Sequence, residues 1–370
     1  MSLGIRAPPV FSLRLIEYPM PTGSRDPDVL LTWILDSMGL IRRRSGQWSG
    51  DEQQGALHRI MREALLADPL RGWDTKDLGD ASRLSHTGTH HQMVKLRSCG
   101  LVSTQVEGKW HVHVLRGGSM SAAVGLVSVQ AKAILELRVS ELAGIVQSSE
   151  TRMEIQAEDE EVKFAISITE PGARSDGEDA IDALVEDLGL NGGRSRDKDR
   201  LARELLCELA NNEQPTTILA LADRFSESRS RVQRAVERMR SAGLVERVPM
   251  VSRISQDVYA GLMRQYDARG EEWLMSRGGL GRLGTSVSKN LLNGVKKGSL
   301  SIEKVQKILV PVPLEDQRIL LNTLGGRMPY GIRMVGADAA EVSERVMRQA
   351  DRALRRLRTV AQRLDDARDV

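Results

Sequence analysis

The sequence predicts a mainly helical protein with small β-hairpins, built around two copies of one helical unit. A 19-residue pattern occurs at residues 84–102 (LSHTGTHHQMVKLRSCGLV) and again at residues 227–245 (ESRSRVQRAVERMRSAGLV). In each copy a serine, Ser85 or Ser228, precedes apolar or small residues at helical spacing, and the copy ends in Gly-Leu-Val. An earlier apolar position also matches, because Leu78 precedes the first copy as Leu221 precedes the second. Such a repeat indicates that one supersecondary unit is used twice.

The composition is that of a globular protein without a disulfide framework. The 370 residues, of which 41% are hydrophobic, are enough for two or three domains with real cores. The two cysteines, Cys99 and Cys207, form no CxxC motif, and no run of about 18 apolar residues occurs. We therefore expect a cytoplasmic protein without a membrane segment. An aromatic content of 3% argues against a single-strand binder that stacks bases on aromatic rings.

An N-terminal segment over residues 1–50 precedes the first copy, which is expected over residues 51–118. The proline-rich residues 1–25 predict an extended arm, and residues 27–40 predict a short apolar helix. Three helices should follow, at 53–67, from Asp74 or Thr75 to Arg83, and after the cap Ser85. Residues 102–106 and 109–115 alternate around Glu107-Gly108, which predicts a hairpin. Three helices followed by a hairpin are the arrangement of a winged helix.

Residues 119–170 are expected to connect the two copies. Residues 120–147 form an Ala- and Val-rich helical stretch that is too apolar for water, so we expect it to pack against another element or a second copy of the chain. Residues 152–157 and 162–169 alternate around the acidic residues 158–161 and predict a second hairpin. Residues 171–199 predict a linker that contains a short acidic helix at 178–188, and they mark the clearest domain boundary.

The second copy is expected over residues 200–254. Helices are predicted at 201–210, 217–225 and 228–242, but Pro249 stands where a wing strand would run, so we expect a short wing or none. Residues 255–335 predict a helical region. Within it, residues 284–309 loosely resemble the recognition helix and following helix of phage-repressor-type domains, with Val287, Leu291 and Leu292 inward and Lys289, Asn290, Lys296 and Lys297 outward. The alternatives are a third DNA- or RNA-contacting module and a helical packing domain.

Residues 337–370 predict a long, charged C-terminal helix. Apolar residues recur along it at spacings of mostly three and four: Val346, Ala350, Ala353, Leu357, Val360 and Leu364. This stripe fits a coiled-coil contact in a homodimer, and it fits packing onto the rest of its own chain equally well.

The outward faces of the two predicted recognition helices carry side chains that suit duplex DNA. Arginine pairs with guanine and glutamine with adenine, while a serine at a helix N-terminus leaves backbone N–H groups for a phosphate. In the first copy the expected DNA-binding residues are Ser85, His86, Thr87, His90, His91 and Lys95, with Lys109 on the wing. In the second copy they are Ser228, Arg229, Ser230, Arg231, Gln233, Arg234 and Arg238.

Residues 78–114 and 221–247 resemble the winged helix-turn-helix transcriptional regulators of the ArsR and MarR type. The stretch LADRFSESRSRVQRAVERMRSAGLVER, at 221–247, is similar to the MarR-type signature. The resemblance implies two winged helices on double-stranded DNA. It implies DNA contacts from Ser228, Arg229, Ser230, Arg231 and Arg234, and from the matching Ser85, His86, Thr87, His90 and His91.

The sequence therefore predicts a sequence-specific transcriptional regulator that binds double-stranded DNA, with no catalytic site, metal or cofactor. It contains no Gly-Lys-Ser/Thr phosphate loop, HExxH or GxSxG motif, and its GxGxxG match at 279–284 follows no clear strand. Its six histidines, between His58 and His113, are accompanied by no acidic or cysteine ligand pattern. The alternative is a winged-helix scaffold for protein interactions in a chromosome-partition or replication-initiation complex.

Overall fold

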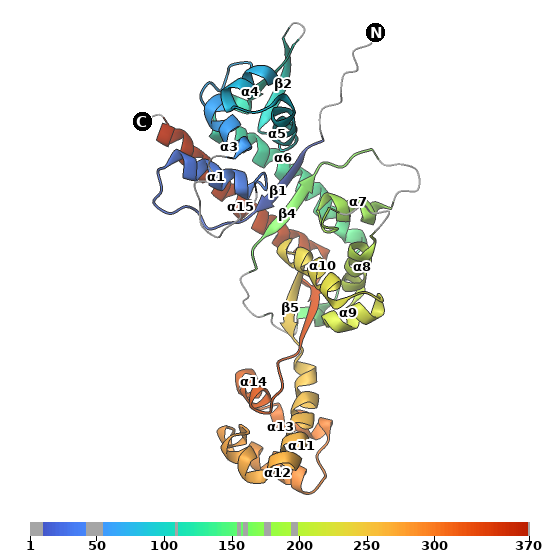
Figure 1. The fold of residues 1–370 in the computed structure, drawn as a ribbon. Helices are drawn as coiled ribbons and strands as arrows, with labels where there is room; N and C mark the ends of the chain where they lie inside the picture. The colour runs from blue at the N-terminus through green and yellow to red at the C-terminus, as the bar shows by residue number, and fades with distance from the viewer. Residues whose placement is uncertain are drawn as a thin grey trace.

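The computed structural model describes residues 10–41, 55–107, 110–153, 157, 162–173, 179–193 and 199–368. Over these residues the protein is mainly helical, with three sheets of two antiparallel strands each. Two long helices, α6 (Met120–Ser140) and α15 (Ala339–Arg368), lie in the middle of the molecule, and a helical lobe projects from one end (Figure 1). The predicted mainly helical fold with small antiparallel sheets is confirmed.

The first unit follows the predicted order. Its helices are α3 (Ala56–Ile60), which continues as a π-helical turn over Met61–Leu65, α4 (Thr75–Ser82) and α5 (His86–Ser98). Asp74 caps α4, because its carboxylate accepts a hydrogen bond from Asp77 N at 2.7 Å. Gly100 follows α5 at φ +79°, and β2 (Val102–Glu107) pairs with β3 (Trp110–Leu115). The predicted hairpin is confirmed, while Gly108 and Lys109 at its turn lie outside the described residues.

The second unit repeats the helices but closes its sheet differently from the prediction. Its helices are α8 (Leu201–Asn211), α9 (Ile218–Arg224) and α10 (Arg229–Ser241), followed by Gly243 at φ +79°. β5 (Val245–Pro249) pairs with β6 (Tyr330–Met334), which lies far along the chain. The sequence prediction did not include this distant partner strand. Pro249 is tolerated because it is the last residue of its strand, where the missing N–H costs little.

Individual backbone contacts recur in the two units. Trp73 forms an isolated antiparallel bridge with His113 of β3, and Thr216 forms the same bridge with Ile332 of β6. The bonds that follow each sheet match as well, from Arg116 N to Leu101 O and from Val335 N to Leu244 O, both at 3.0 Å. β2 and β3 of the first unit are thus equivalent to β5 and β6 of the second.

The strands that precede the two units pair with each other. β1 (Ser12–Ile16) lies within the predicted extended arm, whose residues 1–9 are outside the described residues, and it pairs antiparallel with β4 (Ala165–Thr169). The predicted hairpin over residues 152–169 is wrong, since Glu150–Met153 is a 3-10 turn and the partner of β4 is β1. The predicted acidic tip, 158–161, lies outside the described residues. A short strand with alternating apolar residues can pair with any strand that has the same alternation, and β1 has this alternation.

The register of β1 and β4 is symmetric. Arg14 lies opposite Ser167 at the centre, and the segments FSLRLIE (11–17) and FAISITE (164–170) run in opposite directions around this pair. The outermost bonds match, from Glu17 N to Phe164 O and from Glu170 N to Phe11 O, both at 2.9 Å. A residue at a given distance before the centre of one strand therefore pairs with the residue at the same distance after the centre of the other. A pseudo-twofold axis passes between Arg14 and Ser167.

The helices that follow these strands obey the same symmetry. α1 (Pro27–Ser37) and α7 (Ala180–Asp187) lead into Gly39 at φ +65° and Gly189 at φ +69°. A Cβ on Gly39 would lie 2.7 Å from Arg14 Cβ, and one on Gly189 would lie 2.7 Å from Ser167 Cβ. Glycine is needed at both positions, because each turn approaches the central residue of its own strand in a left-handed conformation.

α6 and α15 form the second contact across the axis. They are antiparallel, since Asp365 near the end of α15 accepts from Met120 N and Ser121 N at 3.1 and 2.8 Å. Lys132 pairs with Asp351 at 3.1 Å, and each lies twelve residues after the first residue of its helix. The predicted stripe of α15 is buried inside the chain, so the alternative of packing within one chain is the one observed: Val346, Ala350, Ala353, Leu357, Val360 and Leu364.

Among the described residues one stretch, Met120–Gly144, is long and apolar enough to cross a membrane. It comprises α6 and a 3-10 turn, Glu141–Gly144. Ala123, Val127 and Ala131 of this stretch are buried in the core that α15 also lines, which is the environment of a core helix. Packing between the two units therefore explains this buried face, while the opposite face, with Leu126, Val129 and Leu137, is exposed.

The lobe that projects from one end is an insertion between β5 and β6. It contains α11 (Val251–Ser276), the 3-10 turn Leu280–Arg282, α12 (Thr285–Lys296), α13 (Ile302–Leu309) and α14 (Leu314–Thr323). Its buried apolar residues form a core of their own, and Gly270 interrupts α11 with φ +74°. Figure 1 shows this lobe attached through β5 and β6 alone. We call residues 251–328 the inserted lobe, residues 12–140 the first half, and residues 165–250 with 329–368 the second half.

One apolar core runs through both halves. It joins Leu13 and Leu15 of β1, Ile166 and Ile168 of β4, and the buried stripes of both units. The predicted linker at 171–199 contains α7, whose Leu184 and Val185 belong to this core, while residues 174–178 and 194–198 lie outside the described residues. The two units are therefore held by shared burial in addition to their covalent connection.

Candidate nucleic-acid interface

α5 exposes polar side chains along its N-terminal half. Ser85 Oγ accepts a hydrogen bond from Gly88 N at 3.2 Å, which confirms the predicted cap. Thr89, Met93 and Leu96 are buried against the first unit. This places the predicted residues His86, Thr87, His90 and His91 on the exposed side, while Lys95 is half-buried. The exposed part of α5 can therefore donate and accept hydrogen bonds, and it carries no acidic group.

α10 exposes a more basic set at the equivalent positions. Val232, Val236 and Met239 are buried, and the side chains of Arg229, Ser230, Gln233 and Arg234 are exposed. Ser228 occupies the N-cap position, but its side chain makes no capping hydrogen bond. The exposed part of α10 thus offers two guanidinium groups and one amide, with the carboxylate of Glu237 two turns after Arg229, paired with Arg240 at 2.8 Å.

Two of the predicted arginines of α10 turn toward the protein. Arg231 pairs with Asp199 at 2.8 Å and with Glu227. Arg238 donates from Nε to Leu190 O at 2.6 Å. Both side chains are half-buried, and they tie α10 to the segments before it. The structure therefore brings Arg229 and Arg234 to the surface as the accessible cations of this helix, and uses Arg231 and Arg238 in packing.

The exposed faces of α5 and α10 border the same side of the β1–β4 sheet. His86, His90 and Val94 share one face of α5 at i, i+4 spacing, as Arg229, Gln233 and Glu237 do on α10. Val94 lines a cleft of about 810 Å³ with Ser12 and Arg14 of β1. Glu237 lines a cleft of about 700 Å³ with the same Ser12 and Arg14, and with Ser167 of β4. Each exposed helix face therefore leads into a cleft that ends at the pseudo-twofold axis.

Arg14 is the side chain at the centre of this surface. Leu13 and Leu15 point into the core, so Arg14 and Ser12 point outward, and both are exposed. Arg14 forms no ion pair with any other described residue. The sequence reasoning missed it, because residues 1–25 were predicted to be an arm. The available signal was the match between FSLRLIE at 11–17 and FAISITE at 164–170.

The predicted cations of α12 lie away from the pseudo-twofold axis, in the inserted lobe. Lys109 is outside the described residues. On α12 of the inserted lobe, Leu291 and Leu292 are buried, and Lys289, Asn290, Lys296 and Lys297 are exposed, as predicted. Lys296 pairs with Glu271 at 2.5 Å. The inserted lobe thus adds basic groups at one end of the molecule.

Burial shifts the pKa of two histidines and one cysteine of the first half in the direction that favours their neutral forms. Burial lowers the pKa of His113 to about 4, and its Nδ1 lies 3.0 Å from Thr104 Oγ1. Burial also lowers the pKa of His58, and burial raises the pKa of the Cys99 thiol to about 12. Across the described residues no cluster of His, Cys, Asp and Glu could hold a metal ion.

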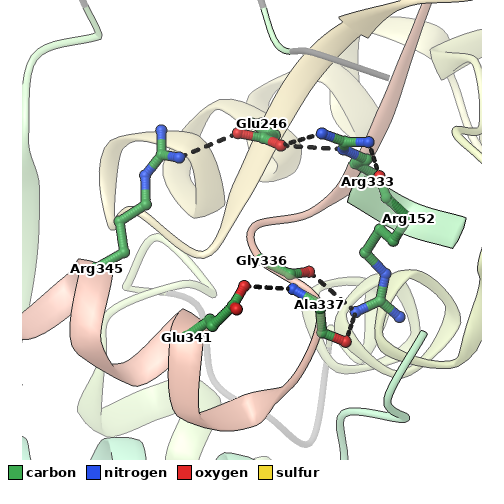
Figure 2. Close-up of polar contacts among 7 residues, drawn as sticks. All are labelled: Arg152, Glu246, Arg333, Gly336, Ala337, Glu341 and Arg345. Atoms are coloured by element: carbon green, nitrogen blue, oxygen red, sulfur yellow. Dashed lines mark hydrogen bonds and ion pairs between the residues drawn. The ribbon is translucent and has the colours of Figure 1, made fainter. Parts of the chain in front are cut away.

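A buried cluster of charges anchors the base of the inserted lobe. Glu246 of β5 pairs with Arg333 of β6 at 2.8 Å and with Arg345 of α15 at 3.1 Å, as Figure 2 shows. Arg152 is also buried, donates to Gln147 O at 3.0 Å and to the carbonyls of Gly336 and Ala337, and receives a bond from Arg333 on its own carbonyl. The cluster joins β5, β6, the connection before β4 and the start of α15.

Comparison with models of known protein families, with curated proteins and with solved structures finds no match. A function is therefore inferred from the geometry of these residues.

Proposed function

We propose that the protein is a sequence-specific regulator of transcription that binds double-stranded DNA through two winged helix-turn-helix units. α5 and α10 would be the recognition helices, and β2–β3 and β5–β6 the wings. The order of three helices and two strands, together with the single bridges from Trp73 and Thr216 to a strand of each sheet, supports this interpretation. Neither an enzymatic activity nor a cofactor is proposed.

The observation that carries the proposal is the common orientation of α5 and α10. Two helices that face one duplex must expose their polar sides in the same direction. Here both exposed sides border the outer face of the β1–β4 sheet, with Arg14 between them. Arg14, Arg229 and Arg234 supply positive charge for phosphates and base edges on this surface.

The test is selection of bound duplexes from a random DNA pool at about 150 mM salt, where binding to phosphates alone is weakened. An enriched motif is expected. The double variant Arg229→Ala with Arg234→Ala should then lower affinity for that motif at least tenfold and reduce the salt slope by about two. Arg231 is left intact because it has a structural ion pair.

A matched control removes the same charge elsewhere. Arg355 and Arg358 are exposed on α15, which packs against the inner face of the sheet, so the double variant Arg355→Ala with Arg358→Ala should leave binding nearly unchanged. Equal losses in the two double variants, or no loss in either, would overturn the assignment of α10 as a recognition helix.

A second candidate, the protein-interaction scaffold, is favoured by the outer face of α6. Leu126, Val129 and Leu137 are exposed there at 44%, 70% and 54%. Exposed apolar side chains along one helix face fit a protein partner. A scaffold would yield no enriched DNA motif, and its DNA binding would disappear as salt rises.

A further inference from the structure

The pseudo-twofold axis specifies the kind of DNA site that this surface would take. We propose that one molecule binds a bipartite duplex, with two unlike half-sites in inverted orientation about one helical turn apart, and that Arg14 enters the minor groove at its centre. This inference rests on the proposed function, because it describes the DNA that the same surface recognises.

The inverted orientation follows from the symmetry of the chain. A twofold axis between two recognition helices relates their half-sites by the twofold axis of the duplex, which is why homodimers bind inverted repeats. Here the axis lies within one chain, between Arg14 and Ser167 and again between Lys132 and Asp351. The pairing of β1 with β4 and of α6 with α15 holds the two helices together as a dimer interface would. One chain therefore suffices for both half-sites.

The expected distance between the two half-sites rests on the separation of α5 and α10. α5 lines one cleft and α10 lines another, and Ser12 and Arg14 of β1 belong to both clefts. Recognition helices that enter successive major grooves on one side of B-DNA are centred about 34 Å, or one turn, apart. This is the shortest spacing at which two separate helices can both enter major grooves from the same side of the duplex.

The half-sites must differ because the exposed side chains differ at each equivalent position. From α5 to α10 the changes are His86 to Arg229, Thr87 to Ser230, His90 to Gln233 and His91 to Arg234. Arginine can form two hydrogen bonds to guanine, and glutamine can form two to adenine. Histidine and threonine offer a base single donors or acceptors. A homodimer cannot make this distinction, since its two recognition helices are identical. The motif is therefore expected to be asymmetric in sequence, with the stronger base preference under α10.

The centre of the site is determined by Arg14. Midway between two successive major grooves on one side of the duplex, the minor groove faces the protein. Arg14 is exposed at this point, and its equivalent across the axis is the short Ser167, so a single arginine can enter without a like charge opposite. Arginine is favoured in the narrow, strongly negative minor groove of A·T tracts. The centre is thus expected to be A·T-rich, although no recognition helix contacts it.

The experiment uses the full chain and duplexes that carry about 30 randomised base pairs, three helical turns. Selection at about 150 mM salt should return two different half-motifs around an A·T-rich centre, and native mass spectrometry on the best duplex should show one chain per duplex. Inserting about five base pairs at the centre, half a turn, should lower affinity at least tenfold, because the two half-sites then face opposite sides.

Arg14 is tested with centres of A·T and of G·C. Arg14→Ala should lower the preference for the A·T centre about tenfold, and Arg14→Lys should restore only part of it, because an ammonium gives up its hydration less readily. The control Arg25→Ala removes the same charge from another exposed position and should leave the preference unchanged.

The outcomes separate the two levels of the argument. An empty selection would overturn both the proposed function and this inference. A single half-motif, or a symmetric palindrome that holds two chains, would overturn the inference while the DNA-binding function stands. An unchanged preference for A·T in Arg14→Ala would overturn the central placement of Arg14.

Discussion

The first and second halves of the chain share a framework and differ on their surfaces. Core positions are apolar in both, as at Leu78 and Leu221 or at Met93 and Val236. Exposed positions diverge, and the first half turns directly from β2 to β3 where the second half carries the inserted lobe. Burial constrains a residue to be apolar whatever the unit does, whereas an exposed residue is free to change. The halves therefore have one fold with two different surfaces.

The long helices show the same contrast. Leu126, Val129 and Leu137 of α6 are exposed and apolar, while the equivalent positions of α15 are Arg345, Arg348 and Arg356. All three arginines have carboxylate partners in the second half or directly after β1: Arg345 with Glu246, Arg348 with Glu344, and Arg356 with Glu17. The arginines of α15 thus form ion pairs within the protein, whereas the equivalent positions of α6 form an exposed apolar face.

The largest expected difference between the halves is at Glu246. Glu246→Ala leaves Arg333 buried without its carboxylate, which should lower the free energy of unfolding by about 3–5 kcal/mol in urea titration. The equivalent pair in the first half is Ser103 and Val114, so Ser103→Ala should cost at most about 0.5 kcal/mol. Replacing both Glu246 and Arg333 with methionine should recover most of the loss. Equal effects of Glu246→Ala and Ser103→Ala would refute this role of the cluster.

Acid should destabilise the first half, which contains all six histidines. The folded pKa of His113, about 4, lies below its value of 6.5 in the unfolded chain, so the unfolded state binds more protons as pH falls. The stability present above pH 6.5 should be lost between about pH 6.5 and pH 4, by up to about 3 kcal/mol. His113→Ile, which copies the equivalent Ile332, should flatten the pH dependence of urea unfolding. An equal dependence of stability on pH in the wild-type protein and in His113→Ile would contradict this role of His113.

Alanine substitutions at Gly39 and Gly189 should lower stability by similar amounts, which tests the symmetry of the two halves. Alanine at either position combines a positive φ with a clash against the central strand residue, so each variant should lose about 2–3 kcal/mol. Gly23 also has a positive φ, +74°, but open space around it, and Gly23→Ala should cost only about 1 kcal/mol. Thermal unfolding of the three variants measures the order. If Gly39→Ala were as mild as Gly23→Ala, the close approach to Arg14 would be refuted.

The smallest expected difference is between the two helix caps. Ser85→Ala removes a capping hydrogen bond and should cost about 1 kcal/mol. Ser228→Ala should cost only a few tenths of a kcal/mol, because its side chain makes no such bond. Urea unfolding of both single variants tests this contrast. A larger loss from Ser228→Ala would show that the second helix depends on its cap as the first does.

The sequence predicted the local structure of both units well. Several features depend only on residues within one or two helical turns of each other. They are the helices, the cap at Ser85, the turn after Gly100 and the outward direction of Arg229 and Arg234. The repeat at 84–102 and 227–245 also lies in the sequence itself, since equivalent buried positions keep equivalent residue types. These features need no knowledge of the rest of the chain.

Tertiary structure alone decided the partners of the strands and of the inward arginines. β4 pairs with β1 and β5 with β6 across long separations, and an alternating strand of five residues carries too little information to select its partner. Arg231 and Arg238 have the spacing of exposed residues, but Asp199 and the Leu190 carbonyl draw them inward. Short-range patterns determine which residues form an element and which of its faces is apolar. Contacts between distant residues determine what that element packs against, because they depend on the path of the whole chain.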